Sequence, residues 1–435
     1  MQNKLSIFWL RRDLRLQDNA ALYHALKSKQ AVQCIFIFDK DILDKLEDKT
    51  DRRVNFIYDT LTALNQELES FGASLWVYYG KPIEIWKEIL EKNEIVEVFV
   101  NHDYEPYAIK RDSAVKNILL IKGIELLSFK DIVIFEKAEV TKEDGLPYTV
   151  FTPYSKRWKA KLNDLYLRPY PTEKYLANLS QSKSKKILVL EEIGFQKNES
   201  TIPPLYIDTE IIQKYNLTRN YPGLLGTSRL GLYLRFGNIS IRALAEVALK
   251  CNETYLNELI WRDFYHQILF HFPQVEKASF KPAYDGIQWR NNEKEYRAWC
   301  DGQTGYPIVD AGMRELNATG FIHNRSRMIV ASFLCKHLLI DWQWGALYFA
   351  QKLLDFDLAA NNGGWQWAAG SGTDAAPYFR IFSPSEQTKK FDAEHIYIKR
   401  WVPEFESLQY VHPIVNHQLA RERCLKVYKE ALEKR

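Results

Sequence analysis

The stretch Asp355-Phe-Asp-Leu-Ala-Ala-Asn-Asn-Gly-Gly-Trp-Gln-Trp367 holds two aspartates, two asparagines, two glycines and two tryptophans within thirteen residues. Asparagine and glycine are poor helix formers, and each glycine costs about 1 kcal/mol in a helix interior. A glycine does let another group come close to the backbone, so we expect this stretch to lie against a flat, aromatic ligand. If the stretch is helical, Asp357, Asn361 and Trp365 share one face, whereas Trp365 and Trp367 point to nearly opposite sides.

Length and composition narrow the class of protein. The chain has 435 residues, of which 46% are hydrophobic and 26% charged, as in globular proteins of two domains. Its 12 Trp, 25 Tyr and 23 Phe are an aromatic excess that suits stacking on rings. The formal net charge of +4 permits nucleic-acid binding without requiring it.

The cysteines and the apolar segments indicate the compartment. The five cysteines are scattered and lack zinc-ligand spacing, so we expect no metal site. No apolar run is long enough to span a membrane, and the N-terminus lacks the pattern of a signal peptide. We expect a cytoplasmic protein that works as a monomer.

The first domain is expected over residues 1–135, where apolar, strand-like runs alternate with amphipathic stretches. Strands are expected at 5–10, 32–38, 74–79 and 96–101, and helices at about 18–29, 52–71, 82–92 and 106–118. Nearly continuous apolar strands between helices predict a doubly wound, parallel α/β sheet. No GxGxxG motif follows these strands, so the sequence does not indicate a nicotinamide cofactor site.

The rest of the chain divides into a connector and a second domain. Residues 136–205 contain prolines and a Lys/Ser-rich segment, which predict an interdomain connector. Helical periods dominate residues 206–435, for example at 242–250, 255–272 and 328–339. We therefore expect the second domain to be all-α.

One predicted helix carries polar and aromatic side chains where a buried stripe would normally lie. The stripe consists of Glu258, Trp261, Arg262 and Tyr265. Their spacing places all four side chains on one helical face. Such a stripe either forms an internal polar network or lines a cavity.

Two further segments hold groups suited to ligand binding. Asn324 and Met328 lie four residues apart, and the Asn324 amide offers both the donor and the acceptor that reading an imide edge requires. Arg325 and Arg327, in the same segment, could pair with phosphate or with Asp355 and Asp357. Thr227 and Ser228 precede a helical pattern, where they could cap the helix or hold a phosphate group.

Six motifs carry a resemblance that spans nearly the whole chain. They are Phe8–Asn19, Gly226–Leu230, Asn257–Arg262, Thr304–Asp310, His323–Met328 and Asp355–Trp367. In content and order they resemble those of the photolyase and cryptochrome flavoprotein family, most closely the class I cyclobutane pyrimidine dimer photolyases. The resemblance implies an α/β antenna domain followed by an all-helical, FAD-binding catalytic domain.

The resemblance also implies an FAD site in the helical domain. The matching positions are Tyr215, Thr227, Ser228, Arg229, Leu230, Tyr255, Glu258, Arg262, Arg327, Asp355, Asp357 and Asn361. Asn361 matches the residue that faces flavin N5, which is Asn in photolyases but Asp in plant cryptochromes and Cys in insect ones. Because an amide does not readily supply a proton, Asn361 suits a flavin that stays reduced for repair.

A light-driven repair reaction is implied by the same resemblance. Excited, reduced FAD gives an electron to a pyrimidine dimer flipped out of UV-damaged DNA, the dimer splits, and the electron returns. The positions that match contacts to the dimer, and so to the DNA, are Glu258, Trp261, Asn324, Met328 and Trp367. Arg219 and Arg325 match contacts to the DNA backbone. The positions that match a relay photoreducing FAD from the protein surface are Trp365, Trp342 and Trp299.

The antenna chromophore and one rival function stay open. Folate-binding members carry Asn-Glu where this chain has Tyr107-Ala108, and Cys-Lys where it has Glu276-Lys277, so a folate antenna is not expected. A deazaflavin, a flavin or no antenna chromophore remain as alternatives. The rival function is that of a cryptochrome-type blue-light photoreceptor, which signals through flavin photoreduction without repairing DNA.

Overall fold

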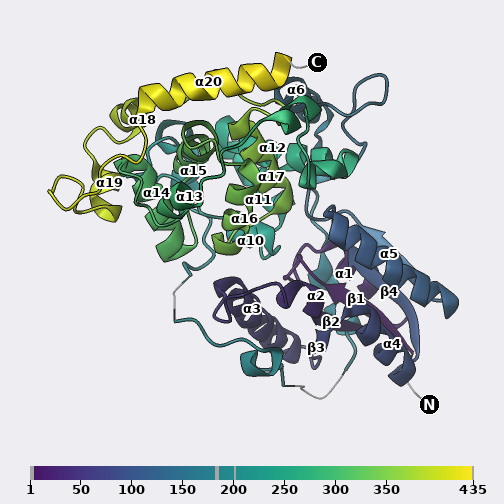
Figure 1. The fold of residues 1–435 in the computed structure, drawn as a ribbon. Coiled ribbons are helices and arrows are strands. Elements are labelled where there is room, and N and C mark those ends of the chain that lie inside the picture. The colour runs from purple at the N-terminus through teal and green to yellow at the C-terminus, as the bar shows by residue number, and fades with distance from the viewer. Residues whose placement is uncertain (1–3, 182–185, 200–201, 434–435) are drawn as a thin grey trace. The chain divides into compact units, whose positions relative to one another are not determined.

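The computed structural model describes residues 4–181, 186–199 and 202–433, which form two compact units (Figure 1). The first unit consists of Met1–Glu136, Leu162–Tyr206 and Leu230–Val247, and the second of Lys137–Lys161, Ile207–Arg229 and Ala248–Arg435. The two units therefore share the segment predicted as a connector, since residues 137–161 belong to the second unit and 162–205 to the first. Part of its Lys/Ser-rich segment, at 182–185, lies outside the described residues.

A five-stranded parallel sheet forms the centre of the first unit. Its strands are β1 (Leu5–Leu10), β2 (Ala31–Asp39), β3 (Trp76–Gly80), β4 (Ile95–Asn101) and β5 (Glu125–Phe129). The order β3-β2-β1-β4-β5 is that of a doubly wound sheet, so the predicted α/β fold of this region is confirmed. The sequence does not predict strand β5, because it is a short edge strand with exposed residues and no continuous apolar run.

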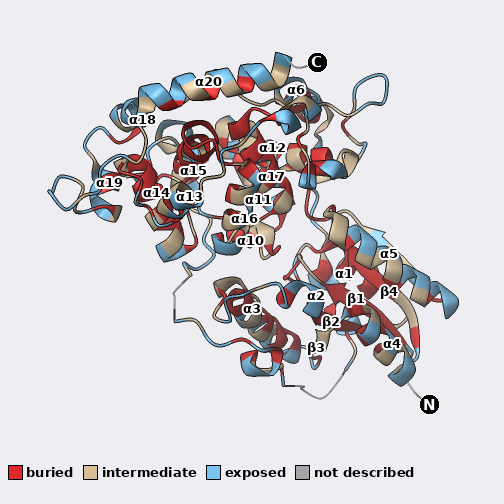
Figure 2. Ribbon diagram, viewed as in Figure 1, coloured by how far each residue is buried: buried red, intermediate tan, exposed pale blue. Residues whose placement is uncertain are grey.

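Helices and short 3-10 turns complete the first unit. They are α1 (Ala20–Leu26), α2 (Lys40–Leu43), α3 (Arg52–Glu69), α4 (Pro82–Lys92), α5 (Pro106–Ile121), α7 (Asp164–Leu167), α10 (Gly231–Arg235), η1 (Thr172–Lys174), η2 (Leu176–Asn178) and η3 (Leu190–Ile193). Strands β1 and β2 are buried almost throughout (Figure 2). Trp9 of β1 packs edge to face on Trp86 of α4, with 5.4 Å between the ring centroids. Because these strands are buried in an apolar layer, they appear in the sequence as nearly continuous apolar runs that predict strands.

The second unit is built of helices, as predicted. They are α6 (Phe151–Lys161), α8 (Thr209–Gln213), α9 (Tyr215–Thr218), α12 (Glu253–His271), α13 (Glu293–Cys300), α14 (Pro307–Thr319), α15 (Asn324–Ser332), α16 (Trp342–Lys352), α17 (Leu358–Ala369), α18 (Pro384–Phe391), α19 (Ile396–Trp401) and α20 (His417–Glu433). Shorter elements are η4 (Pro273–Glu276), η5 (Pro282–Gly286) and the π-helix η6 (Phe333–His337), while α11 (Ile241–Cys251) begins in the first unit and ends in the second.

Helix α17 contains most of the 355–367 stretch. It forms despite its asparagines and glycines because it packs against α12, α15 and α16, and tertiary packing outweighs weak helix propensity. Gly363 faces the protein itself, since a Cβ there would lie 2.2 Å from the ring of Tyr265. A Cβ on Gly364, by contrast, would meet no atom within 4 Å. Of the two glycines expected to face a ligand, Gly363 accommodates a tyrosine of the same chain and Gly364 borders open space.

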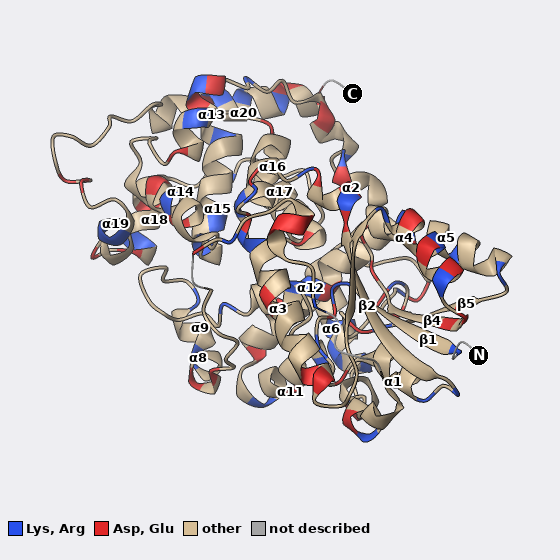
Figure 3. Ribbon diagram, turned by 90° about the horizontal axis from the view of Figure 1, so that it is seen from below, with Lys and Arg blue, Asp and Glu red and all other residues tan. Residues whose placement is uncertain are grey.

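Charged residues are distributed unevenly over the helices. Helices α4, α5 and α20 carry both basic and acidic residues, whereas α15 carries Arg325 and Arg327 with no acidic residue (Figure 3). Within the described ranges, no helix is both long and apolar enough to cross a membrane. The same residues contain no group of three or more His, Cys, Asp or Glu arranged to hold a metal ion.

Candidate functional site

Helix α12 presents the predicted polar and aromatic stripe on one face. The helix starts at Asn252, whose side-chain oxygen accepts hydrogen bonds from the backbone N–H groups of Thr254 and Tyr255 at 2.9 and 3.2 Å. This cap fixes where the helix begins and therefore which side chains share a face. Glu258 and Trp261 are only half-buried, as are the other two members of the stripe. A half-buried stripe of this composition is suited to line a binding site.

Glu258 forms an ion pair with Arg219. The Arg219 Nη1 and Glu258 Oε1 atoms are 2.6 Å apart, and the two side chains are 27% and 29% exposed. Burial raises the pKa of Glu258, and the guanidinium of Arg219 opposes that rise. The guanidinium also lies over the ring of Tyr215, 5.4 Å from its centroid. The structure thus pairs a residue predicted to touch the dimer with one predicted to touch the DNA backbone.

The loop before α10 brings predicted cofactor residues together. The Ser228 hydroxyl lies 2.9 Å from that of Tyr255, and Tyr255 packs edge to face on Tyr215 at 5.1 Å. Arg229 adopts a left-handed backbone with φ of 54°, a conformation that costs energy in a non-glycine residue and is frequent at functional sites. Leu230, the N-cap of α10, provides no side-chain cap.

Of the two roles considered for Thr227 and Ser228, helix capping is therefore not observed. Helix α10 begins only at Gly231, after the loop. Thr227 and Ser228 are half-buried and sit in irregular backbone. Their hydroxyl groups remain suited to contact a ligand. Leu230 itself is buried in the first unit, whereas Ser228 and Tyr255 belong to the second.

The acidic and amide groups around α17 are held in defined positions. Asp355 accepts two hydrogen bonds from Nη2 of Arg327, at 3.0 and 2.9 Å. Asp357 caps α17 by accepting from the Ala360 N–H at 3.1 Å. The Asn361 amide nitrogen donates to the carbonyl of Ala346 at 3.1 Å, which leaves the amide oxygen as an acceptor. Arg327 therefore pairs with an aspartate of the 355–367 stretch, one of the two roles considered for it.

Asn324 and Arg325 stand at the start of α15. Asn324 is exposed, and the helix is capped by His323, whose Nδ1 accepts from the Arg325 N–H at 3.1 Å. Burial, together with the nearby arginines, lowers the pKa of His323 to about 4, so the ring is neutral near pH 7. Arg325 donates from Nη2 to the Asn220 side chain at 2.6 Å and from Nη1 to the Met328 sulfur at 3.5 Å. The predicted Asn324, Arg325 and Met328 are thus neighbours on one exposed helix start.

The three tryptophans of the predicted relay lie in one apolar cluster. Trp365 and Trp299 are in edge-to-face contact with 6.0 Å between ring centroids, and Trp342 belongs to the same cluster. Trp299 is 0% exposed. Trp289 and Trp344 pack against the cluster while remaining partly exposed. Sequence spacing could not separate buried from exposed tryptophans here.

The two indoles of the 355–367 stretch differ in their surroundings. Both lie within α17, as the helical alternative required. Trp365 is 2% exposed inside the apolar cluster, whereas Trp367 is half-buried at its border. The difference agrees with side chains that leave a helix on nearly opposite sides.

Two family models match the chain, and they follow one another along it. The model described as "DNA photolyase" matches residues 6–174, and the "FAD binding domain of DNA photolyase" matches residues 255–409. The deoxyribodipyrimidine photo-lyase of Halobacterium salinarum is 34% identical over 98% of this chain and 99% of that protein. The chain belongs to the DNA photolyase family.

Solved structures of DNA photolyases share the fold over almost the full length. A class III photolyase from Agrobacterium tumefaciens superposes with a TM-score of 0.86 at 31% identity, covering 99% of this chain and 98% of that one. An archaeal photolyase from Sulfolobus tokodaii, solved with two FAD molecules, gives a TM-score of 0.83 at 33% identity, covering 98% and 100%. The antenna-plus-helical architecture expected of the family is therefore confirmed.

The stripe on α12 also has an aromatic neighbour that no sequence pattern indicates. Phe151, at the start of α6, stacks face to face on Trp261, with centroids 3.8 Å apart and planes 3° apart. Phe151 lies in the segment predicted as a connector. No periodicity links it to Trp261 on α12, so only the folded structure could reveal the pair.

The residues of the second unit fit the FAD that the family binds. Three observations test the fit: open space borders Gly364, the oxygen of Asn361 remains as an acceptor, and the Ser228 loop offers hydroxyls beside Tyr255. A flat ring could approach α17 at Gly364, and phosphate oxygens could accept from the loop. The match to the FAD-binding model covers α12, α15 and α17.

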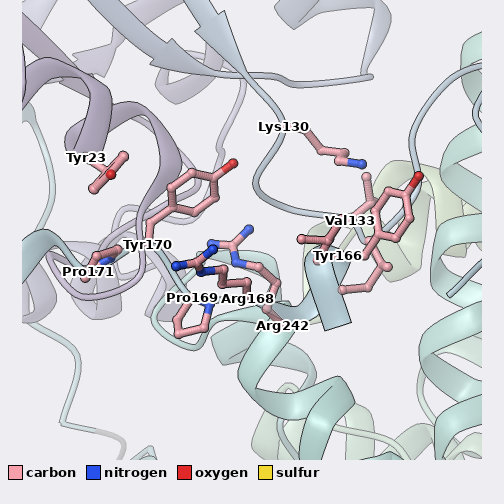
Figure 4. A pocket seen from close by; sticks show the side chains of 11 residues that line it. Tyr23, Lys130, Val133, Tyr166, Arg168, Pro169, Tyr170, Pro171 and Arg242 are labelled. Atoms are coloured by element: carbon pink, nitrogen blue, oxygen red, sulfur yellow. The ribbon is translucent and has the colours of Figure 1, made fainter. Parts of the chain in front are cut away.

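A separate pocket lies in the first unit (Figure 4). Its volume is about 450 Å³, and Tyr23, Lys130, Tyr166, Tyr170 and Arg242 are among its lining residues. Two of its cations are already engaged, because Arg242 donates to carboxylates inside the unit and Lys130 lies over the Tyr166 ring at 5.1 Å. None of the predicted cofactor, dimer or relay residues lines this pocket.

Proposed function

We propose that this photolyase-family chain is a deoxyribodipyrimidine photo-lyase, a light-driven enzyme that splits cyclobutane pyrimidine dimers in UV-damaged DNA. The curated relatives at 34 to 36% identity that carry this name support the assignment. The structural observation that carries it is the ion pair of Arg219 with Glu258, because Glu258 shares one face of α12 with Trp261. We further propose that the protein acts as a cytoplasmic monomer.

FAD, when bound and reduced, supplies the electron that opens the cyclobutane ring after blue-light excitation. The residues proposed to hold it are Tyr215, Thr227, Ser228, Arg229, Leu230, Tyr255, Glu258, Arg262, Arg327, Asp355, Asp357 and Asn361. Arg327 and Asp355 keep each other in place through two hydrogen bonds. The Asn361 amide oxygen can accept a hydrogen bond, its nitrogen donates one to the Ala346 carbonyl, and a neutral amide does not readily give up a proton.

Five side chains are proposed to meet the dimer: Glu258, Asn324, Trp261, Met328 and Trp367. Glu258 and Asn324 offer polar atoms to the pyrimidine edges, and the two indoles offer faces and edges for contact. Burial raises the pKa of Glu258 and so favours its protonated form, which can donate a hydrogen bond to a dimer carbonyl. Such a donor stabilises the negative charge that develops on the dimer after it takes up an electron.

Arg219 and Arg325 are proposed to contact DNA phosphates. Both carry a guanidinium that is only partly buried, and phosphate contacts of this kind supply much of the affinity of any DNA-binding protein. Each is held by a neighbour, Arg219 by Glu258 and Arg325 by Asn220. The dimer must leave the stack to reach the site, and a damaged pair costs less to flip than an intact one.

Trp365, Trp342 and Trp299 are proposed to conduct electrons toward the flavin. Their burial in one apolar cluster supports a common function. Because Trp299 is wholly buried, a more exposed residue must complete the path to solvent. Trp289 and Trp344 are partly exposed aromatic residues beside the cluster that suit this role.

Repair of a thymine-dimer oligonucleotide tests the proposal. Purified protein is loaded with FAD, reduced, mixed with the oligonucleotide and exposed to blue light, and restored thymines are quantified against a dark sample. Glu258→Ala should lower the repair yield by roughly tenfold, since a hydrogen bond to a charged group is worth about 1.5–3 kcal/mol.

The matched control is Glu253→Ala, which changes an exposed glutamate on the same helix. Its ion pair with Lys159 lies at the surface, and such pairs contribute little. Equal repair by both variants would contradict the role of Glu258. Absence of repair in the unmodified protein, with FAD bound, would favour the photoreceptor alternative.

A further inference from the structure

The indole of Trp261 is stacked more tightly than an ordinary aromatic contact. Its ring centroid lies 3.8 Å from that of Phe151, and the two planes differ by 3°. Aromatic side chains usually pair at about 4.5–7 Å in offset or edge-to-face arrangements. Phe151 therefore lies flat against one face of the indole, and a base can stack only on the face turned away from it.

Two anchors hold Phe151 in place. Its backbone N–H, at the start of α6, donates to the carboxylate of Asp374 at 3.2 Å. Phe264 contacts both members of the stack edge to face, at 5.9 Å from Phe151 and 5.5 Å from Trp261. Tyr154, one turn further along α6, packs on the same Phe264 at 5.2 Å. The Phe151 ring is thus fixed by elements on either side of it.

A third aromatic residue bounds the indole from α12 itself. Tyr265 lies 5.3 Å from Trp261 with a tilt of 32°. Its own ring rests against Gly363 of α17, where any Cβ would come within 2.2 Å. Trp261 therefore has little room to change rotamer, and its plane is set by neighbours from α6 and α12.

We propose that Phe151 is a positioning residue for dimer recognition: by stacking on Trp261 it fixes the indole plane, so that the remaining face is ready to receive the flipped pyrimidine pair. This inference rests on the proposed repair function. An indole that is already immobilised loses little side-chain freedom when the lesion binds, which favours affinity for the lesion. The Phe151 ring packs on Trp261 and Phe264, neither of which is a predicted cofactor or relay residue, so its effect should fall on binding.

The test compares Phe151→Leu, which removes the ring, with Phe151→Tyr, which keeps it. Phe151→Leu should raise the Kd for dimer-containing DNA about fivefold, as expected when a preorganised contact is lost. Its Kd for undamaged DNA, its FAD content and its repair yield per photon at saturating DNA should stay unchanged. Phe151→Tyr should restore the Kd for dimer DNA. Quenching of Trp261 fluorescence, referenced to a Trp261→Phe variant, should follow the same order.

A matched control is Phe272→Leu, which removes a half-buried ring from the end of α12. Phe272 has its own edge-to-face partner, Phe280, at 5.1 Å. The control substitution should leave the Kd for dimer DNA unchanged. If it weakened dimer binding as much as Phe151→Leu does, the effect would reflect general loss of packing and the proposal would fall.

Three further outcomes bear on the positioning role of Phe151. Unchanged dimer binding in Phe151→Leu would overturn the positioning role while leaving repair itself intact. If Phe151→Leu lost FAD, Phe151→Met would be tested in its place, because the flexible methionine side chain adapts to a gap without supplying a ring. FAD loss in both variants would make Phe151 a general packing residue. Failure of the unmodified protein to repair dimers would instead contradict the proposed repair function. The test of that function and the test of the Phe151 positioning role can therefore fail independently.

Discussion

Gly363 lies directly beneath the ring of Tyr265, so closely that a Cβ on the glycine would sit 2.2 Å from two ring carbons. At the same position on its neighbour Gly364, nothing beyond the adjoining residues and the local helix backbone lies within 4 Å. Two adjacent glycines in one helix thus have different reasons to be glycine. The first admits a side chain of the protein, and the second leaves room beside α17.

Alanine at each of these glycines should therefore act differently. Gly363→Ala should destabilise the apoprotein by about 1–3 kcal/mol, the usual cost of overpacking, as measured by thermal unfolding. Gly364→Ala should stabilise the apoprotein by about 0.5–1 kcal/mol, because alanine replaces glycine in a helix interior. If FAD occupies the open space, Gly364→Ala should also weaken FAD binding in a titration. Full FAD affinity in Gly364→Ala would show that the flavin ring does not approach α17 there.

The Arg219–Glu258 pair predicts a pH effect on repair. Burial raises the pKa of Glu258 and Arg219 opposes the rise, so removing the cation by Arg219→Gln should raise that pKa further. Repair that depends on protonated Glu258 declines as pH increases through this pKa. In Arg219→Gln the decline should move to higher pH, measured as repair yield per photon at saturating DNA.

A control for the pH effect is the similarly exposed pair formed by Arg314 and Glu404, also 2.6 Å apart. Arg314→Gln should leave the pH profile of repair unchanged. An Arg219→Gln profile that coincided with that of the unmodified enzyme would argue against protonated Glu258 as a donor.

The tryptophan cluster predicts a separation between photoreduction and repair. Trp365→Phe should slow photoreduction of oxidised FAD while leaving repair by chemically pre-reduced enzyme largely intact, because only the first process needs the relay. Trp299→Phe should act in the same direction, since the two rings are in contact. Trp401→Phe, at the edge of the same cluster, serves as control and should change neither rate. If the pre-reduced Trp365→Phe enzyme lost repair activity, Trp365 would be needed for repair itself and not only for the relay.

Asn324→Ala should weaken repair with little effect on stability. Asn324 is exposed and His323 caps its helix, so the free energy of unfolding should change by no more than about 0.5 kcal/mol. Loss of one hydrogen bond to the dimer should lower affinity for dimer DNA roughly fivefold, while affinity for undamaged DNA stays constant. Equal loss for both DNAs would assign Asn324 to the backbone contacts instead.

The parts of the fold that the sequence predicts are those with a strong local signal. Strands β1 and β2 are buried on both faces and therefore appear as continuous apolar runs, whereas the edge strand β5 lacks such a run. The stripe on α12 follows helical spacing, so spacing alone assigns Glu258 and Trp261 to one face. Helix α17 forms although its asparagines and glycines have low helix propensity, because packing against three other helices stabilises it.

The parts that the sequence could not predict depend on contacts between distant segments. Nothing in the sequence around Trp299 distinguishes a buried tryptophan from a surface one, so its burial is seen only in the structure. The role of Gly363 depends on Tyr265, a residue of another helix. The ion pair of Arg219 with Glu258 joins α12 to the end of α9, and the sequence of neither segment predicts this contact.

The stack of Phe151 on Trp261 also bears on how the second unit folds. The α12 stripe is local and can form as soon as that helix does, but Phe151 reaches Trp261 only after a long loop closes. Contacts between residues far apart in sequence are slow to form because closure entropy must be overcome first. During refolding, helical content should therefore return before the stack of Phe151 on Trp261 forms. Selective binding of damaged DNA should accordingly be regained late.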